Sequence, residues 1–433
     1  MRLRLLACAV VAVLTAATLG TPAEAAAKKP GTVGLVSVTG AAPYDSSGKK
    51  YAKISISWPK ATRAKKYQVF VAGSRAGVAK AKKPRVTVKS RKATITKLKR
   101  NRTYWIQVRA VNGSKAGKRS ARIARVTPAA TASLWSKRHP VYRLMSYNVC
   151  SNACSTWETR QPLVVNEVLR LKPDVLAVQE ASRWKNAVIP GYTETLGGKD
   201  NRIFYRTAAF EQVTQRLSAT QQSSECPLQT DPRTGKVVRD DEGDPVRVEP
   251  CVLPLDGVAE PEGKDAPWSV LRHKASGQAV VFVGIHLKVD EGGSNATVRA
   301  RQTSQIFTDL GNQLAWWGKR LHNLPVVLLG DFNTNRSRAG NSRLETVMQA
   351  NGFYDAYEQA LKVSRQHFNT ANPRWSTKPV VGVTWGDHVD KVWVRPGRSR
   401  VHQWANVGKM SGGRFVAPLP SDHHPLMVRA QVS

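Results

Sequence analysis

Short runs in which apolar and polar residues alternate follow one another through the first third of the chain. Alternation with a period of two places every second side chain on the same face of a strand, and regularly spaced runs of this kind are typical of a β-sandwich. We therefore predict an all-β sandwich over residues 28–128. Its expected strands lie at 54–58, 67–71, 86–88, 93–96 and 104–111.

From about residue 141 the pattern changes, because continuous apolar runs of strand length now alternate with longer segments of helical periodicity. This mixture predicts an α+β domain over residues 141–433, which a linker at 129–140 joins to the sandwich. The expected strands lie at 142–149, 174–179, 202–205, 279–287 and 324–329. The expected helices lie at 160–171, 296–321 and 342–351.

Residues 217–267 interrupt this second pattern. The segment is rich in proline, glycine and aspartate, holds 11 acidic and five basic side chains, and contains no aromatic residue. A segment of this composition contributes little to a packed core, so we expect a surface insertion.

The sandwich segment resembles a fibronectin type III domain. Trp58 ends the second strand of such a domain, Tyr67 opens the next, and Tyr104 follows Leu98 at the position of a tyrosine corner. The resemblance implies a binding or spacing module rather than a catalytic one.

The first 27 residues have the features of a signal peptide. Arg2 and Arg4 precede an apolar run at 5–19, and Ala23-Glu24-Ala25 provides a small-x-small cleavage site. We therefore expect a secreted protein, and we expect it to be a monomer. No later stretch reaches the roughly 20 apolar residues of a membrane span, so no transmembrane segment is expected.

Four cysteines follow the signal peptide, and three pairings of them are possible. We favour the two local disulfides, Cys150 with Cys154 and Cys226 with Cys251, because an exported protein meets an oxidising environment. A zinc site is the alternative, but no histidine lies close to these cysteines in the sequence.

Charge is distributed unevenly along the chain. The formal net charge is +37, and residues 28–128 contribute 27 basic side chains against one acidic residue, Asp45. Such a segment is expected to bind polyanions, for example nucleic acid, anionic wall polymers or acidic lipid surfaces. The alternative is a solvated, lysine-coated module that has no partner.

Polar and acidic side chains follow several apolar strands of the second domain. A β-sheet presents a metal and phosphate site in this way, because rigid strands hold the ligands at one edge while loops admit the substrate. Taken singly, each residue could instead be a turn residue, a surface ion-pair member or a structural histidine. The residues concerned are Asn148, Glu180, His286, Asp331, Asn333, Asp390, Asp422 and His423.

Taken together and in this order, these segments resemble the signature set of the endonuclease/exonuclease/phosphatase superfamily, which includes DNase I. The most specific matches are LLGDFN at 328–333 and SDHHPL at 421–426, and the resemblance extends from about 142 to 433. It implies a DNase I-like, four-layer α/β/β/α sandwich.

The resemblance also implies a metal site and a base. Asn148, Glu180 and Asp422 match metal-binding positions, and oxygen ligands of this kind suit Mg²⁺, with Mn²⁺ as the alternative. His423 and Asp390 match a His–Asp pair in which the carboxylate fixes the tautomer of the imidazole, so that the ring can take a proton from water.

Three further residues match positions around the phosphate. Asp331 and Asn333 match residues that orient the attacking water and hold the phosphate, and either Asp331 or His423 serves as the base. His286 matches a histidine that contacts the phosphate and can protonate the leaving oxygen, although no carboxylate partner for it is evident in the sequence. His388 stands where the family usually has a basic residue, which puts one phosphate contact in doubt.

These residues predict in-line attack of water on phosphorus without a covalent intermediate. The leading hypothesis is an extracellular nuclease, because positive charge attracts a polyphosphate substrate. The first alternative is a secreted phospholipase C or sphingomyelinase-like enzyme, which the lack of aromatic residues in the insertion disfavours. The second is a non-catalytic polyanion-binding protein, which the complete set of competent side chains disfavours.

Overall fold

The structure is a computed structural model of the 433-residue chain. It describes residues 27–132, 139–184, 187–195, 200–213, 234, 236–239, 242–243, 245, 252–254, 265–289, 295–316 and 323–433. The predicted signal peptide, apart from its last residue, and most of the predicted insertion lie outside these residues, as does the predicted disulfide of Cys226 with Cys251. None of the described helices is long and apolar enough to cross a membrane.

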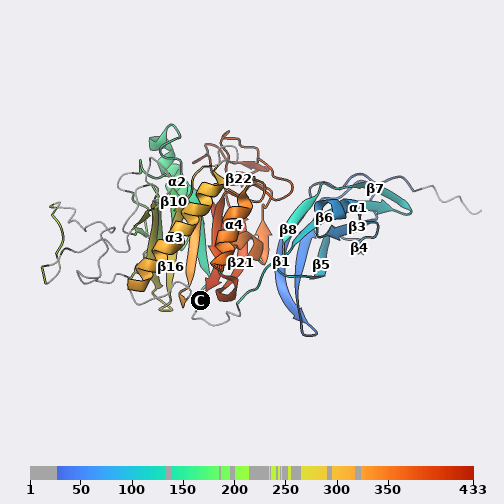
Figure 1. The fold of residues 1–433 in the computed structure, drawn as a ribbon. Helices are drawn as coiled ribbons and strands as arrows, with labels where there is room; N and C mark the ends of the chain where they lie inside the picture. The colour runs from blue at the N-terminus through green and yellow to red at the C-terminus, as the bar shows by residue number, and fades with distance from the viewer. Residues whose placement is uncertain are drawn as a thin grey trace, which may run out of the picture.

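Residues 37–126 form two antiparallel sheets around one apolar core (Figure 1). Buried and exposed side chains alternate along these strands, so that Ile54, Ile95 and Ile106 lie in the core. The first sheet contains β1 (Ser37–Ser46), β2 (Lys49–Ser57) and β5 (Lys92–Leu98). The second contains β4 (Val86–Val88), β3 (Lys66–Ala72), β6 (Thr103–Asn112) and β7 (Lys115–Arg119), with β8 (Ile123–Val126) paired to β6 and α1 at Arg75–Lys80.

Residues 142–432 contain two larger sheets with both parallel and antiparallel pairs. The first has the order β11 (Tyr192–Glu194), β12 (Arg202–Arg206), β10 (Val175–Gln179), β9 (Tyr142–Asn148), β24 (Leu426–Val432), β21 (Ser399–Asn406) and β19 (Lys362–Ser364). The second has the order β13 (Phe210–Gln212), β15 (Asp265–His273), β16 (Ala279–His286), β17 (Val326–Asp331), β20 (Asp390–Val394) and β18 (Tyr354–Asp355), with β14 (Val252–Pro254) paired to β15.

Three apolar cores separate this domain into four layers. One core lies between the two sheets, and a second lies between the first sheet and α2 (Trp157–Leu171). The third lies between the second sheet and helices α3 (Ala296–Trp316) and α4 (Asn341–Ala350). The predicted α/β/β/α order is therefore present. Shorter elements are α5 (Ala356–Gln359), the 3-10 helix η3 (Pro396–Arg398) and the hairpin of β22 (Met410–Ser411) and β23 (Arg414–Phe415).

Candidate active site

The pairing of the strands brings most of the predicted site residues to one edge of the two sheets. β9 and β10 run parallel and place Asn148 level with the residue that precedes Glu180. β16 and β17 are also parallel and pair His286 with Asp331. β20 runs antiparallel to β17 and pairs Asp331 with Asp390, the first residue of its strand. Strand ends from both sheets therefore supply the side chains of a single site.

Asn148 connects the two sheets at this edge. Its Nδ2 donates hydrogen bonds to Glu180 Oε1 at 2.8 Å and to Asp331 Oδ2 at 3.2 Å. Its Oδ1 accepts a hydrogen bond from the backbone N–H of Cys150 at 3.0 Å. One amide thus holds two carboxylates close together, and like charges in such proximity favour the binding of a cation.

The backbone at three site positions is left-handed. Cys150, Glu180 and Asn333 have φ values of 47°, 55° and 50°. Residues with a Cβ rarely adopt this conformation, and where they do, the position is often functional. The backbone N–H of Asn333 donates to Asp331 Oδ1 at 2.8 Å, and its Nδ2 donates to the carbonyl of Leu287 at 3.0 Å. These bonds hold the turn after β17 in place.

His423 lies between two buried carboxylates. Its Nδ1 is 2.9 Å from Asp390 Oδ2, and its Nε2 is 3.8 Å from Asp331 Oδ2. Although desolvation favours the neutral ring, Asp390, Asp331 and Asp422 raise the pKa of His423 to about 10. Desolvation likewise opposes ionisation of Asp331, yet the nearby His423 and His286 lower the pKa of its carboxyl group below the ordinary value. His423 and Asp331 thus stabilise each other's charged forms.

The structure supplies the carboxylate partner of His286 that sequence reasoning missed. His286 Nδ1 lies 3.5 Å from Asp200 Oδ2, and its Nε2 lies 3.9 Å from Glu180 Oε1. Asp200 precedes β12, and its Oδ1 accepts a hydrogen bond from Asn152 Nδ2 at 3.2 Å. His286 therefore has an acidic group near each ring nitrogen.

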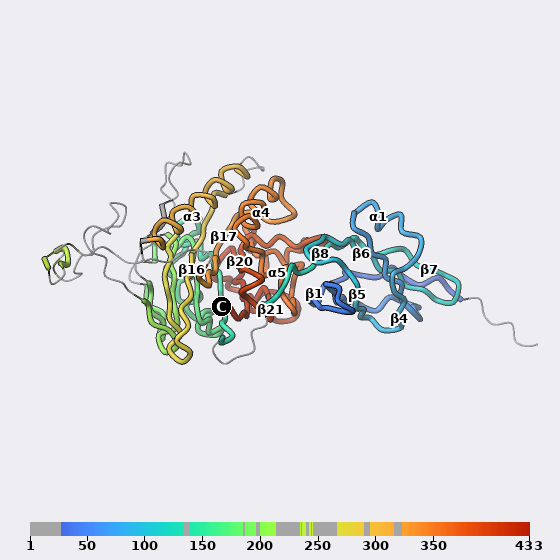
Figure 2. Tube along the Cα trace, turned by 60° about the horizontal axis from the view of Figure 1, so that its bottom comes forward, coloured from blue at the N-terminus to red at the C-terminus, as the bar shows by residue number. Residues whose placement is uncertain are grey.

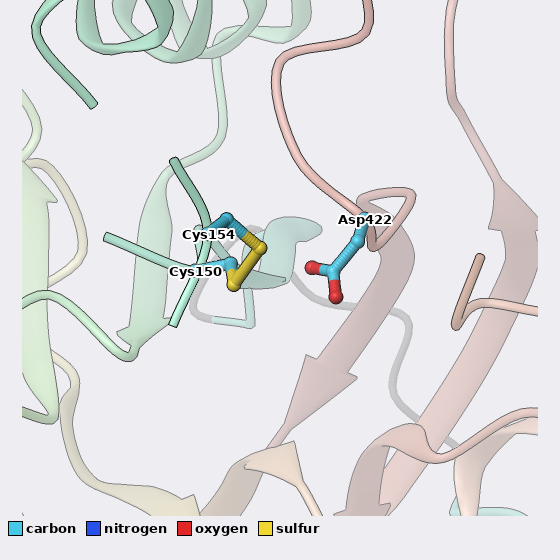
Figure 3. Close-up of side chains that lie close together, drawn as sticks. All are labelled: Cys150, Cys154 and Asp422. Atoms are coloured by element: carbon cyan, nitrogen blue, oxygen red, sulfur yellow. A yellow bond between two sulfur atoms is a disulfide. The ribbon is translucent and has the colours of Figure 1, made fainter. Parts of the chain in front are cut away.

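Asp422 lies beside the disulfide of Cys150 and Cys154 (Figure 3). Ligand atoms of these three residues are within 4.8 Å of one another. The predicted pairing of Cys150 with Cys154 is confirmed, and the zinc alternative is wrong for these two cysteines, because bonded sulfurs are not thiolate ligands. Ser421 Oγ donates to the backbone carbonyl of Asn148 at 2.8 Å, which attaches the loop of Asp422 to the end of β9.

Arg160 of α2 is a second residue that sequence reasoning missed. The side chain is buried, and its Nη1 donates to the carbonyls of Val149 and Pro420, both at 3.0 Å. Its Nη2 donates to the carbonyl of Cys150 at 2.7 Å. The guanidinium therefore fastens the disulfide loop to the segment that precedes Asp422. Only the burial of a cation within an otherwise amphipathic helix could have indicated this role.

The donor set of Asn148, Glu180 and Asp422 fits a magnesium or manganese ion. Hard divalent cations prefer carboxylate and amide oxygens and need few protein ligands. A different group, formed by Asp331, Asp390 and His423, brings its ligand atoms within 4.8 Å of one another. We interpret that group as a hydrogen-bonded relay, because Nδ1 of His423 is engaged by Asp390.

Two other histidines near the site have structural environments. His388 is buried against Tyr357 and Trp404, and its Nε2 lies 2.6 Å from the carbonyl of Gln366. His424 stacks on Phe415. Desolvation lowers the pKa of each ring to about 3, so both are neutral at physiological pH. Being buried and neutral, His388 cannot replace the basic residue that the family usually has at its position.

Comparison with known proteins agrees with the fold of residues 142–432. The model of the endonuclease/exonuclease/phosphatase family matches residues 145–423, whereas no curated protein matches the chain. The mannosyl-6-phosphatase of Bacteroides thetaiotaomicron is 19% identical, over 67% of this chain and 99% of that chain, with a TM-score of 0.46.

Two further solved structures are similar to the chain. The human Nocturnin catalytic domain with bound sulfate is 18% identical, over 68% of this chain and 94% of that chain, with a TM-score of 0.43. The D. rerio TDP2 in complex with a single-strand DNA product is 15% identical, over 67% of this chain and 98% of that chain, with a TM-score of 0.43. The family match spans more than half of the 433 residues and contains all eight residues of the site together with part of each sheet. The chain belongs to the endonuclease/exonuclease/phosphatase family and is a hydrolase that acts on phosphoester bonds.

Proposed function

We propose that the protein is a secreted, metal-dependent phosphodiesterase that cleaves nucleic acid. The observation that carries the proposal is the hydrogen-bonded pair of His423 and Asp390, which lies next to Asp331 at an edge shared by two sheets. Hydrolysis of a phosphodiester by water requires a positioned base and carboxylates that can hold a metal ion, and this imidazole and the clustered carboxylates can serve as these groups.

Asn148, Glu180 and Asp422 would hold the divalent cation. Once bound, the cation would neutralise the charge that develops on the phosphoryl oxygens. Mg²⁺ suits these oxygen ligands best, and Mn²⁺ accepts the same set.

His423 is the proposed base. Asp390 engages its Nδ1. The surrounding carboxylates raise the pKa of the ring to about 10, and a divalent cation bound nearby would lower that pKa, so that Nε2 could take a proton from the attacking water. Asp331 is less suited to this role, because its two oxygens already accept hydrogen bonds from Asn333 and Asn148. In this proposal Asp331 orients the water instead.

His286 is the proposed acid on the leaving-group side. Asp200 Oδ2 lies 3.5 Å from Nδ1, close enough to orient the ring. The ring can then give a proton to the leaving oxygen of the phosphodiester. Asn333, held between Asp331 and the carbonyl of Leu287, is placed to contact the phosphate.

The accessory domain supports nucleic acid as the substrate. Its 27 basic side chains against one acidic residue would attract a polyphosphate chain in a salt-dependent way.

Two observations support the fibronectin type III-like assignment for residues 28–128. The segment forms two antiparallel sheets, and the hydroxyl of Tyr104 accepts a hydrogen bond from the backbone N–H of Lys99 at 2.9 Å, as in a tyrosine corner. The disulfide of Cys150 with Cys154 is consistent with secretion.

A phospholipid is the second candidate substrate, because one segment after β19 exposes several apolar side chains. Trp375, Val380, Val381 and Val383 are each more than a third exposed. Exposed tryptophan and aliphatic residues can insert into the interface of a membrane.

A direct comparison of substrates tests these proposals. Purified protein with Mg²⁺ is offered plasmid DNA, RNA and sphingomyelin vesicles in parallel, with His423→Ala as the control for contaminating enzymes. We expect cleavage of nucleic acid that the variant lacks. Release of phosphocholine without cleavage of nucleic acid would contradict the nuclease proposal, and failure on all three would contradict the phosphodiesterase proposal.

A further inference from the structure

The segment between β19 and β20, residues 365–389, lies between the sandwich and the site. On the sandwich side, Nε2 of buried His367 is 2.8 Å from the carbonyl oxygen of Val36. The backbone N–H of Ala124 donates to the carbonyl of Thr384 at 3.0 Å. The rings of Trp105 and Trp385 meet edge to face, with centroids 5.9 Å apart. The sandwich therefore contacts this segment at two separate places.

The same segment contacts the site residues on its other side. Thr370 Oγ1 accepts hydrogen bonds from the backbone N–H groups of Val389 and Asp390, at 3.1 and 3.2 Å. Ala371 forms a β-bridge with His423, and the backbone N–H of Asn372 donates to the carbonyl of Asp422 at 2.5 Å. The segment thus holds the backbone of three site residues.

A buried arginine provides a further contact between the sandwich and the catalytic domain. Arg125 of β8 is fully buried, and its Nη2 donates to the carbonyl of Tyr357 at 2.5 Å. Its guanidinium lies 4.1 Å from the centre of the Tyr357 ring, which packs against His388, two residues before Asp390. A buried cation depends on its few partners, and Arg125 has the Tyr357 carbonyl and ring only while the two domains are docked, so this contact indicates a permanent interface.

The backbones of the two domains also approach closely. The N–H of Ala41 in β1 donates to the carbonyl of Ala360 at 3.2 Å. A Cβ on Gly40 would collide with the carbonyl of Leu361, so only glycine allows this approach. Figure 2 shows β1 and β8 next to α5 and β21 of the catalytic domain. A flexibly tethered module would not need such contacts.

We propose that the sandwich is a positioning element of the active site. Through residues 365–389 it fixes the backbone of Asp390 and His423, and His367 is the positioning residue that joins the two domains. The inference rests on the proposed function only in that His423 and Asp390 are taken as the residues that activate water. Small misplacements of such groups reduce turnover strongly, even when the change lies far from the chemistry.

A pair of variants at His367 tests this proposal. Leucine removes both ring nitrogens, whereas glutamine keeps an N–H that can reach the carbonyl of Val36. The full-length proteins are compared on bis(4-nitrophenyl) phosphate, a substrate too small to contact both domains. We expect His367→Leu to lower kcat about tenfold with KM unchanged, and His367→Gln to restore most of the loss. Lys53→Ala, an exposed position on β2, should leave both parameters unchanged.

The outcomes separate this inference from the proposed function. If wild-type protein does not hydrolyse the diester, the proposed function fails. If it does, and folded His367→Leu retains full kcat, the positioning role is wrong. Should His367→Leu not fold, Trp105→Ala decides, since this partly exposed ring contacts Trp385 across the interface and its removal leaves the buried contacts in place. A two- to fivefold loss of kcat supports the proposal, and unchanged kcat overturns it.

Discussion

The two His–Asp pairs of the site differ in how firmly they are held. His423 Nδ1 and Asp390 Oδ2 are 2.9 Å apart, and the aspartate side chain is fully buried. His286 Nδ1 and Asp200 Oδ2 are 3.5 Å apart, and 36% of the aspartate side chain is exposed. Asp390 starts β20, a strand paired on both sides, whereas Asp200 lies in the loop before β12.

This difference indicates unequal roles for the two histidines. A short hydrogen bond to a buried carboxylate fixes both the tautomer and the orientation of His423 before substrate arrives. The longer contact to a partly exposed loop aspartate holds His286 less firmly, so its ring is easier to reorient. We therefore expect the first pair to carry most of the catalysis, and four substitutions measure how unequal the pairs are.

His423→Ala should have the largest effect. Loss of the proposed base is expected to lower kcat on bis(4-nitrophenyl) phosphate about 10⁴-fold while the thermal midpoint stays close to that of wild type. His402→Ala, a partly exposed histidine on β21, is the matched control and should leave kcat unchanged. A loss of less than tenfold for His423→Ala would remove this residue from the chemistry.

Asp390→Asn should follow, with kcat reduced about 10³-fold, because an amide cannot hold the Nδ1–H tautomer of the imidazole. The side chain keeps its size, so we expect little change in folding. Steady-state kinetics together with a thermal melt separates the two effects. Equal kcat values for Asp390→Asn and wild type would show that the buried pair has no catalytic role.

His286→Gln should lower kcat about 10²-fold on a diester whose leaving group is an alkoxide, because such a group needs a proton as it departs. With a 4-nitrophenolate leaving group the loss should be several times smaller, since that anion is stable without protonation. If the substitution lowers kcat by the same factor on both substrates, His286 contacts the phosphate but is not the acid.

Asp200→Asn should have the smallest effect, a loss of less than about tenfold in kcat on the alkoxide substrate, since solvent can replace part of the carboxylate's influence. The same kinetic assay measures it beside Asp390→Asn. Equal losses for the two asparagine variants would contradict the comparison between the pairs.

Strand ends made much of this site predictable from sequence. Each of Asn148, Glu180, His286 and Asp331 ends or directly follows an apolar run, and parallel pairing brings such ends together. Alternation of apolar and polar residues likewise predicted the two sheets of the sandwich.

Contacts that depend on tertiary approach were not predictable. Asp200 lies in a loop with no periodic pattern, and its role follows only from the position of His286. From the sequence alone, Arg125 and Arg160 would be expected to lie on the surface. In the structure each is buried and hydrogen-bonded to carbonyls of distant segments. The docking of the sandwich on the catalytic domain was missed for the same reason, because its basic composition pointed only to external partners.

Metal-dependent hydrolysis of a phosphodiester is the central claim, and a chelation experiment tests it most directly. Wild-type protein is treated with EDTA, dialysed, and assayed on bis(4-nitrophenyl) phosphate as Mg²⁺ is added back, with Glu180→Gln treated in the same way. We expect that wild-type activity disappears on chelation and returns with Mg²⁺, whereas the variant needs a much higher Mg²⁺ concentration or does not recover. Full activity of the chelated wild-type enzyme would contradict it.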